Sequence, residues 1–425
     1  MAIRILLMNV HSLKNCGDAA LTQVALEQLR ASFPGCQISI LLNDPQHFPG
    51  DEPKFLSLIG WVKQGLRWQL LKLGWMLFSS TIFILSWRVS RAPLNLTGSR
   101  ILSDSLRAIT QADLVVGTPG GYLQSSGRGL TLLLILYTMF LALLAGKPIY
   151  LLPQSFGPLK RRWEIWLTRH LLNHARLVMA REPVSFSKLR EWGVRPDHCR
   201  LLTDLAFAYV GDEGNQAQAW LRSQGVDPHS DRPLIGVTVM NWGAQNRAFK
   251  GQQEYEQIVA HTLEDFLVRN GGKALLFPQS WGPSSIEDDR IPARSLLERM
   301  PRVSQRVILV DAPLPPGLLK SVFGQMDLLL GTRMHSNIFA LAQYVPVLLI
   351  GYNHKTIGIA QTLGLEEWVV DINQLDEGTL KHKLALLWEK RDAISHLLRG
   401  KIPNLIEIAQ QAGGLIAADF AKIHR

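Results

Sequence analysis

Short apolar runs that predict β-strands alternate with helical patterns through almost the whole chain of 425 residues. This alternation is typical of parallel sheets covered by helices on both faces. The predicted strands are residues 3–10, 37–42, 113–117, 148–152 and 176–180 in the first half, and residues 234–239, 273–277, 307–310, 327–331 and 345–350 in the second. The sequence therefore predicts an α/β protein with two similarly wound halves.

A polar segment divides the chain near its middle. The length alone favours two or three domains. Residues 211–231 carry glycine, asparagine, aspartate and proline, a composition typical of a domain boundary. We predict an N-terminal domain at residues 1–210, a linker at 211–231, a C-terminal domain at 232–399 and a C-terminal helix at 400–425.

One internal repeat supports two related halves. The segment P-Q-S-F-G-P at residues 153–158 recurs as P-Q-S-W-G-P at residues 278–283, each time directly after a predicted strand. At such strand ends the side chains of Gln154, Ser155, Gln279 and Ser280 can donate hydrogen bonds to a ligand. The alternative is a shared turn chemistry without functional meaning.

Residues 55–103 differ from the rest of the first half. They contain no Asp or Glu but six Lys or Arg, around an uncharged apolar centre at residues 73–87. This centre is shorter than the roughly 18 to 20 residues that span a bilayer, and Trp75 and Trp87 bracket it. The pattern predicts a helical insertion that lies on an anionic membrane surface. The alternative is an insertion packed on the domain itself. A second apolar run, residues 130–145, predicts a buried crossover helix.

The net charge of +10 indicates an acidic partner, such as a phosphorylated metabolite, an anionic membrane or a nucleic acid. Nucleic acid is disfavoured, because no basic run is interleaved with aromatics and no zinc-finger spacing is present. Three widely separated cysteines indicate a reducing compartment. The apolar N-terminus predicts a first strand and lacks the layout of a signal peptide. We therefore expect a cytoplasmic protein, peripheral at the inner face of the cell membrane.

The segment Gly331–Ser336 is the strongest candidate for a functional site. It follows a predicted strand and precedes a predicted helix, which is where ligands bind in open α/β sheets. Arg333 supplies a fixed cation there and His335 an imidazole. In the alternative interpretation Arg333 pairs with a local carboxylate and His335 only starts the helix.

Two glycine-containing segments also follow predicted strands. Asn15-Cys16-Gly17-Asp18 precedes a helix expected to begin near Ala19. Asp18 is either the N-cap of that helix or a base for a substrate hydroxyl. Gly120 and Gly121 allow close approach of the backbone to a ligand, or form only a tight turn.

Three further charged residues stand at strand ends. Arg181 is suited to hold a carboxylate or phosphate through two hydrogen bonds, unless it pairs with Glu182 or another acid. Asp204 is expected to position a hydroxyl or a cationic side chain. Lys355, with Tyr352 before it, follows the next strand after His335 and is expected to face the same crevice. No cluster has metal-ligand spacing, and the pair Asp288-Asp289 is expected on a solvated surface.

The ordered motifs resemble the polysaccharide pyruvyl transferase family. They are N-x-G-D from Asn15, a Gly-Gly loop, P-Q-S-x-G-P, R-E-x-x-S, D-x-A-F, the second P-Q-x-x-G-P, G-x-R-x-H and Y-x-x-K. The resemblance runs from about Asn15 to beyond Lys355. It implies two Rossmann-like domains facing across a cleft, as in GT-B glycosyltransferases. One departure is that Gly120-Gly121 is followed by Tyr122, where the family often has a third glycine.

The resemblance also implies a reaction. Members of the family transfer the enolpyruvyl part of phosphoenolpyruvate to two hydroxyls of a sugar, forming a pyruvate ketal and releasing phosphate. By motif, the catalytic residues are Arg181, Arg333, His335 and Lys355. We expect His335 as the proton donor, the three cations as anion-binding groups and Asp18 as the base for the attacking hydroxyl.

The remaining candidates are expected to contact substrate: Asn15, Gly17, Gly120, Gly121, Gln154, Ser155, Asp204, Gln279, Ser280 and Tyr352. No metal or cofactor is expected beyond phosphoenolpyruvate as donor substrate. The acceptor is a saccharide, and lipid-linked precursors at the membrane are frequent acceptors in such families. Two alternatives stay open: a nucleotide-sugar glycosyltransferase of the same fold, and an inactive membrane-associated component of polysaccharide assembly.

Overall fold

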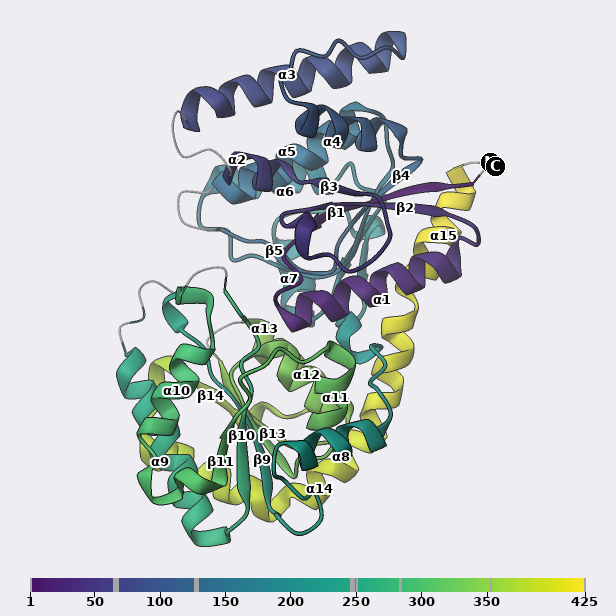
Figure 1. The fold of residues 1–425 in the computed structure, drawn as a ribbon. Helices are drawn as coiled ribbons and strands as arrows, with labels where there is room; N and C mark the ends of the chain where they lie inside the picture. The colour runs from purple at the N-terminus through teal and green to yellow at the C-terminus, as the bar shows by residue number, and fades with distance from the viewer. Residues whose placement is uncertain are drawn as a thin grey trace. The chain divides into compact units, whose positions relative to one another are not determined.

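The computed structural model describes residues 2–63, 69–125, 130–244, 249, 251–282, 285–351 and 354–423. The chain divides into two compact units. The first contains Met1–Leu13, Leu21–Leu205 and Ile408–Arg425, and the second contains Lys14–Ala20 and Ala206–Glu407. Each unit is a parallel sheet with helices packed on it (Figure 1).

The sheet of the first unit has the strand order β3-β2-β1-β4-β6-β7-β8, and β5 pairs with β6 outside this path. Every pairing is parallel. The strands are β1 (Arg4–Val10), β2 (Gln37–Leu42), β3 (Lys54–Leu56), β4 (Leu114–Gly117), β5 (Gly120–Leu123), β6 (Ile149–Phe156), β7 (Leu177–Ala180) and β8 (Cys199–Leu201). Strands β4, β6 and β7 are buried at every residue, which explains the continuous apolar sequences of β4, of β7 and of residues 149–152 in β6.

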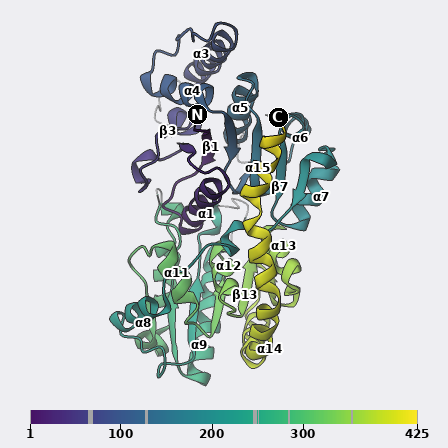
Figure 2. The ribbon, with the colours of Figure 1, turned by 90° about the vertical axis from the view of Figure 1, so that its right-hand side faces the viewer.

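The helices of this half are α1 (Cys16–Ser32), α2 (Leu58–Lys63), α3 (Gln69–Ser90), α4 (Arg100–Gln111), α5 (Leu130–Leu144), α6 (Arg162–Leu172) and α7 (Pro183–Glu191), with 3₁₀ turns η1 (Pro45–His47), η2 (Pro196–His198) and η3 (Leu205–Phe207). A last helix, α15 (Ala412–Ile423), returns to the first unit and runs beside β6 (Figure 2). Its Asp419 accepts hydrogen bonds from Tyr150 (3.0 Å) and from Arg176 (2.9 Å).

The sheet of the second unit has the order β11-β10-β9-β12-β13-β14, again parallel. Its strands are β9 (Leu234–Thr238), β10 (Lys273–Leu276), β11 (Val307–Leu309), β12 (Leu328–Gly331), β13 (Val347–Gly351) and β14 (Val369–Asp371). Its helices are α8 (Gly214–Ser223), α9 (Gln252–Asn270), α10 (Arg290–Glu298), α11 (Pro316–Phe323), α12 (Met334–Ala342), α13 (His354–Leu363) and α14 (Glu377–Gln410). The 3₁₀ turns are η4 (Trp242–Ala244), η5 (Ser285–Glu287), η6 (Pro301–Arg306), η7 (Glu366–Trp368) and η8 (Ile372–Gln374). Residues 211–231, expected as a linker, contain α8, which packs against α11.

Each of the ten predicted strands corresponds to a strand of the structure, and the prediction of two parallel α/β sheets is confirmed. The short strands β3, β5, β8 and β14 were not predicted. The interpretation that the repeated P-Q-S segment marks equivalent places in the two sheets was wrong. In the first unit the segment lies inside β6, which is separated from the first strand, β1, by β4. In the second unit it follows β10, which is paired directly with the first strand, β9, on the side away from β12.

The apolar segment at residues 73–87 belongs to α3, which packs one face against α4 and α5. Residues Met76, Ser79, Ser80, Phe83 and Ile84 of that face are fully buried. Helix α5 confirms the helix predicted at 130–145, but it is buried on one side only, because Leu130, Leu133 and Phe140 are exposed. Among the described residues, no helix combines the length and the apolar character that crossing a membrane requires.

Candidate functional site

Arg181 follows β7 and is held by two side chains of the first unit. Its Nε donates to Ser155 Oγ (2.8 Å) and its Nη1 donates to Asp204 Oδ2 (2.6 Å). The Arg181 and Asp204 side chains are 2% and 0% exposed. A carboxylate compensates the buried guanidinium charge, as a buried cation requires. The expectation that Asp204 positions a cationic side chain is confirmed for this pair.

The acid beside Arg181 in sequence has a different role. Glu182 is the N-cap of α7, and its carboxylate accepts a hydrogen bond from the Ser185 N–H (2.7 Å). Pro183 occupies the first turn, where a missing N–H costs nothing. The alternative that Arg181 pairs with Glu182 or another acid is confirmed, and the acid is Asp204.

A group of polar atoms is buried near the carboxyl ends of β1, β5 and β6. Burial raises the pKa of Tyr122, whose hydroxyl faces Asn9 and Gln154. No hydrogen bond of ordinary geometry forms among the described residues to the Tyr122 hydroxyl, to Asn9 Nδ2 or to either amide atom of Gln154. Asn9 also has a φ of 64°, a left-handed conformation that is uncommon outside glycine. Unmet hydrogen-bonding capacity and backbone strain are both more frequent at functional sites than elsewhere.

The expected Gly-Gly loop is a short strand. Gly120 pairs with Gln154 in the β5–β6 ladder and has a φ of 131°, which explains why glycine is needed there. Gly121 lies in the same strand. The loop interpretation was wrong because the segment is too short to show the alternation that identifies a strand in sequence.

In the second unit, Arg333 forms a two-point ion pair with Asp289. Its Nε donates to Asp289 Oδ2 (2.9 Å), and its Nη2 donates to Asp289 Oδ1. The same carboxylate accepts hydrogen bonds from the N–H groups of Gln279 (3.1 Å) and Ser280 (3.0 Å). Asp289 is therefore the common partner of the second P-Q-S segment and of Arg333. The expectation that it lies on a solvated surface was wrong, since its side chain is 0% exposed.

His335 is the second residue of α12, and its ring lies against the backbone of Gly17. A methyl group on Gly17 would be 2.0 Å from His335 Nδ1, so only glycine fits at this position. Asn15, two residues earlier, forms an isolated antiparallel bridge with Ser280. The second unit thus brings together Asn15, Gly17, Gln279, Ser280, Asp289, Arg333 and His335.

The start of α1 differs from its prediction. The helix begins at Cys16, and Asn15 Oδ1 accepts hydrogen bonds from the N–H groups of Gly17 (3.0 Å) and Asp18 (3.2 Å). Asn15 therefore performs the capping role proposed for Asp18. Asp18 lies in the first turn, where a carboxylate is favoured by the helix dipole.

The remaining candidates flank this group. Lys355 is the second residue of α13 and follows β13, the parallel neighbour of β12, so Lys355 and Arg333 stand at the same edge of the sheet. Ser336 Oγ and Asn337 Oδ1 are buried and have no hydrogen-bond partner among the described residues. Tyr352 lies outside the described residues. No group of three or more His, Cys, Asp or Glu suited to a metal ion occurs in the part of the chain that the structure describes.

Sequence reasoning missed Asp289, Asn9 and Tyr122. A buried arginine at a strand end requires a carboxylate partner in the same unit, but the sequence does not show which acidic residue that is. Asp289 could therefore be recognised as the partner only from the structure. Asn9 interrupts the apolar run of β1 at its carboxyl end, which is a weak signal for a polar site. The candidates of the first unit are Gly120, Gly121, Gln154, Ser155, Arg181 and Asp204, and the others belong to the second.

Comparison with solved structures shows the fold. HepE from Anabaena in complex with UDP-glucose has a TM-score of 0.57 at 12% identity, covering 99% of each chain. Sucrose-phosphate synthase from Thermosynechococcus elongatus also has a TM-score of 0.57, at 13% identity, covering 99% of this chain and 100% of that one. MnaA from S. aureus in complex with UDP has a TM-score of 0.58 at 10% identity, with 94% and 91% covered. The protein therefore has a GT-B-like fold with two parallel α/β sheets.

Comparison of sequences is more specific. The amylovoran biosynthesis protein AmsJ of Erwinia amylovora is 23% identical over 440 residues, and the alignment covers 99% of each chain. The family model described as polysaccharide pyruvyl transferase matches residues 15–354, from the cap of α1 to the start of α13. Because this match spans most of the chain and includes both arginine–aspartate pairs, the protein belongs to the polysaccharide pyruvyl transferase family.

Proposed function

We propose that the protein transfers the enolpyruvyl group of phosphoenolpyruvate to two hydroxyls of a sugar in a cell-surface polysaccharide or its precursor, forming a cyclic pyruvate ketal. The observation that carries this proposal is the family match over residues 15–354. The relative AmsJ is named for amylovoran biosynthesis, which supports a biosynthetic saccharide as acceptor.

The reaction needs one proton delivered and one phosphate released. Protonation of the methylene carbon of phosphoenolpyruvate turns it into the methyl group and leaves a cationic centre at the second carbon. One sugar hydroxyl attacks that carbon and loses its proton. The second hydroxyl then replaces the phosphate, and its proton leaves with the phosphate. In total one C–H and two C–O bonds form, and the C–O bond to the phosphate breaks. The protein must therefore supply an acid, a base and cationic groups for the carboxylate and phosphate.

His335 is our proposed acid, because an imidazole titrates closest to neutral pH. Its ring is fixed against Gly17, and a fixed donor needs little reorganisation during proton transfer. Asp18, one residue beyond Gly17, is our proposed base. Both roles belong to the second unit, which makes them testable by substitution without reference to the first.

Arg333 and Lys355 are the proposed anion-binding groups of the same unit. The bond between Arg333 and Asp289 uses the Nε–Nη2 edge of the guanidinium, so the Nη1 group points elsewhere and can donate to a substrate oxyanion. Asp289 would then set the direction of the guanidinium, and the N–H groups of Gln279 and Ser280 would fix Asp289 in turn.

In the first unit, Arg181 is too deeply buried to act as a simple surface cation. We propose that it orders Ser155 of β6 and Asp204, which follows β8. The buried amide of Gln154 and the hydroxyl of Tyr122 would form hydrogen bonds with hydroxyl groups of the sugar, which can both donate and accept.

Phosphate release from phosphoenolpyruvate in the presence of candidate saccharides tests the proposal, with the new ketal methyl group detected by proton NMR. His335→Ala should lose turnover by at least a hundredfold while phosphoenolpyruvate still raises the thermal midpoint. His396→Ala is the matched control, because His396 is exposed on α14. Equal turnover of the His335→Ala protein and the control would remove His335 from the acid role.

A panel of ligands separates the proposal from other functions of the same fold. Stabilisation by phosphoenolpyruvate supports the pyruvyl transferase. Stabilisation by a UDP- or GDP-sugar alone would indicate a glycosyltransferase instead. Stabilisation by neither ligand, together with no phosphate release, would support an inactive component of polysaccharide assembly.

A further inference from the structure

Helix α3 presents an apolar stripe to solvent along its whole length. The exposed side chains are Leu71, Trp75, Phe78, Leu85 and Val89, and Ile82 between them is half-buried. The intervals of three and four residues place all six on one side of the helix. Trp75 and Phe78 are 50% and 52% exposed, although burial of either would be favourable. An exposed apolar stripe of this size marks a site of contact with a membrane or with another protein.

The sequence that contains this stripe is strongly basic. Residues 54–163, which include α3 and α5 and end at the start of α6, carry 13 Lys or Arg but only two Asp and no Glu. Their net charge of +11 therefore exceeds the +10 of the whole chain, and the rest of the protein is close to neutral. Near the end of α3, Arg91 and Lys147 both lie over the Trp87 ring, at 4.7 and 4.8 Å from its centroid.

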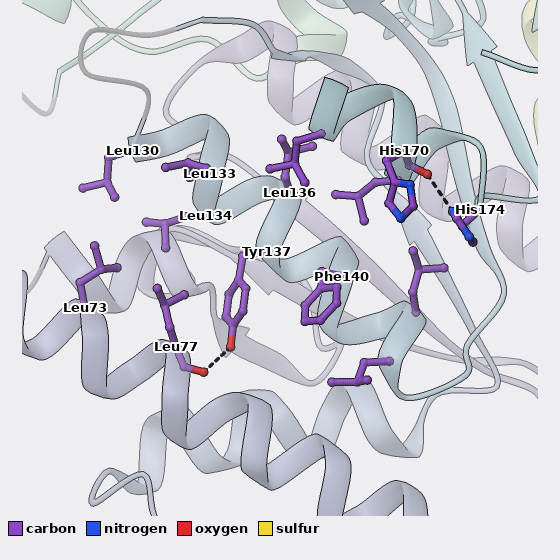
Figure 3. Close-up of a pocket in the computed structure, with 14 residues that line it drawn as sticks. Leu73, Leu77, Leu130, Leu133, Leu134, Leu136, Tyr137, Phe140, His170 and His174 are labelled. Atoms are coloured by element: carbon purple, nitrogen blue, oxygen red, sulfur yellow. Dashed lines mark hydrogen bonds between the residues drawn. The ribbon is translucent and has the colours of Figure 1, made fainter. Parts of the chain in front are cut away.

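Beside the stripe, α3, α5 and α6 line an apolar groove with a volume of about 550 Å³. Leu73 and Leu77 of α3 form one wall, and Leu133 and Phe140 of α5 form the other (Figure 3). The one tyrosine in the lining, Tyr137, donates its hydroxyl to the Leu77 carbonyl (2.6 Å), so its ring and not its polar atom faces the groove. The walls therefore offer nothing but hydrocarbon and aromatic surface over most of their length.

The groove is polar at one end only. Figure 3 shows His170 and His174 at the end opposite Leu73 and Leu130. The His170 ring stacks on Trp166 of α6, which is 64% exposed. Lys160 and Arg161 precede α6, Arg162 is its first residue, and all three are exposed at the end of the helix away from His170. A hydrocarbon channel that ends at two imidazoles has the polarity of a single-chain amphiphile with a polar head.

We propose that α3, α5 and α6 form a membrane-docking face, and that the groove accepts one acyl chain of an anionic bilayer phospholipid. Exposed tryptophans surrounded by Lys and Arg are the composition of surfaces that lie at a charged bilayer. A second copy of this chain is a poor occupant, because a symmetric pairing would place two faces of the same positive charge against each other. The inference goes beyond the proposed function, and its tests use no pyruvyl transfer.

The first test is sedimentation of the full chain with phosphatidylcholine vesicles that contain or lack 30% phosphatidylglycerol. We expect binding only to the anionic vesicles, and loss of that binding in 0.5 M salt. The double variant Trp75→Glu/Phe78→Glu should bind at least tenfold more weakly. The matched control is Val210→Glu/Val268→Glu, which adds the same charge at exposed apolar residues of the second unit and should bind like the parent protein.

The second test asks whether an acyl chain enters the groove. Phosphatidylglycerol with a photoreactive diazirine in its acyl chain is incorporated into the vesicles, and cross-linked peptides are mapped by mass spectrometry. We expect adducts on α5 and on the end of α6, in the peptides that contain Leu133, Phe140 and His170. Leu133→Trp should reduce these adducts severalfold while leaving sedimentation unchanged, because the larger ring fills the groove and not the outer stripe.

Several results would overturn the inference. Equal binding of both double variants to the vesicles would show that this face does not dock to the membrane. Adducts confined to α3 would show that the acyl chain does not enter the groove, although the outer stripe contacts the membrane. If light scattering showed an oligomer that only Trp75→Glu/Phe78→Glu dissociates, with no vesicle binding by the parent protein, the face would be a protein interface. None of these outcomes depends on whether phosphate is released from phosphoenolpyruvate.

Discussion

Arg333 is bound through two of its nitrogens to Asp289, a carboxylate 44 residues earlier in the chain that is completely buried. The pair links the end of β12 to the segment after β10, because Asp289 also accepts hydrogen bonds from the backbone of Gln279 and Ser280. Removing one member of such a pair leaves the other charge buried without compensation, which is more costly than the loss of the bond itself.

Asp289→Asn should therefore lower the free energy of unfolding by about 3 kcal/mol. The Asn amide keeps the size of the carboxylate but cannot balance the Arg333 charge. Thermal unfolding measures the change. Asp311→Asn serves as the control, because Asp311 and its partner Arg294 are both about half exposed, and it should cost less than about 1 kcal/mol. Similar effects of the two substitutions would mean that the buried charge is not the dominant cost.

Gly17→Ala tests the contact between α1 and His335. A glycine inside a helix usually costs about 0.5–1 kcal/mol relative to alanine, so the substitution would be stabilising if space allowed. Here the new methyl group meets the imidazole ring, and we expect lower stability together with a loss of turnover through displacement of His335. Gly400→Ala lies in α14 with open space around it and should stabilise the protein. A rise in thermal midpoint for both variants would contradict the contact.

Two buried tyrosines distinguish a functional hydroxyl from a structural one. Tyr150 donates to Asp419, so Tyr150→Phe should cost about 1–2 kcal/mol. Within the described part of the chain the Tyr122 hydroxyl has no such bond, so Tyr122→Phe should change stability by less than about 0.5 kcal/mol. If Tyr122 contacts the acceptor, the same variant raises KM for the saccharide severalfold. An unchanged KM would assign Tyr122 to packing alone.

Lys320 gives the protein a pH-dependent stability. Its ammonium donates to the carbonyls of Phe207 and Tyr209, and burial lowers its pKa from 10.5 to about 8. Between these two values the unfolded chain binds more protons than the folded one, so raising the pH stabilises the fold. The free energy of unfolding of the parent protein, relative to Lys320→Met, should rise by up to about 3 kcal/mol from pH 8 to pH 10.5 and stay level below pH 7. Urea unfolding across this range measures the difference, and a flat difference would place the Lys320 pKa near its ordinary value.

The strands were predictable because buried parallel strands are short continuous apolar runs, and every predicted run corresponds to one. The partners of the arginines were less accessible. Asp204, 23 residues after Arg181, was a candidate from its sequence motif, although the short strand β8 before it was not predicted. Asp289 follows another aspartate in a polar stretch of sequence. Nothing in the neighbouring residues indicates that Asp289 is buried and not exposed to solvent. Tertiary packing alone decides which of Asp288 and Asp289 faces Arg333.

The apolar insertion illustrates the same limit. Its sequence shows an uncharged centre flanked by cations, and this indicates a surface helix. It does not show that Phe140 of α5 and His170 of α6 line one groove with Leu73 of α3, because that requires the packing of α3 against α5 and of α5 against α6. Helix α5 carries an apolar sequence on both sides, so its periodicity could not separate the buried face from the exposed one.

The last helix has a consequence for synthesis on the ribosome. The first unit holds the N-terminal strands, but it is completed only by α15, whose Asp419 bonds to Tyr150 and Arg176. The ribosome must therefore synthesise the whole of the second unit before the first unit can acquire its final helix. The long segment Leu21–Leu205 of the first unit is synthesised early, but the second unit is complete at Glu407, before the first unit receives Ile408–Arg425. The N-terminal half is thus the last to mature, which reverses the usual order of domain folding during translation.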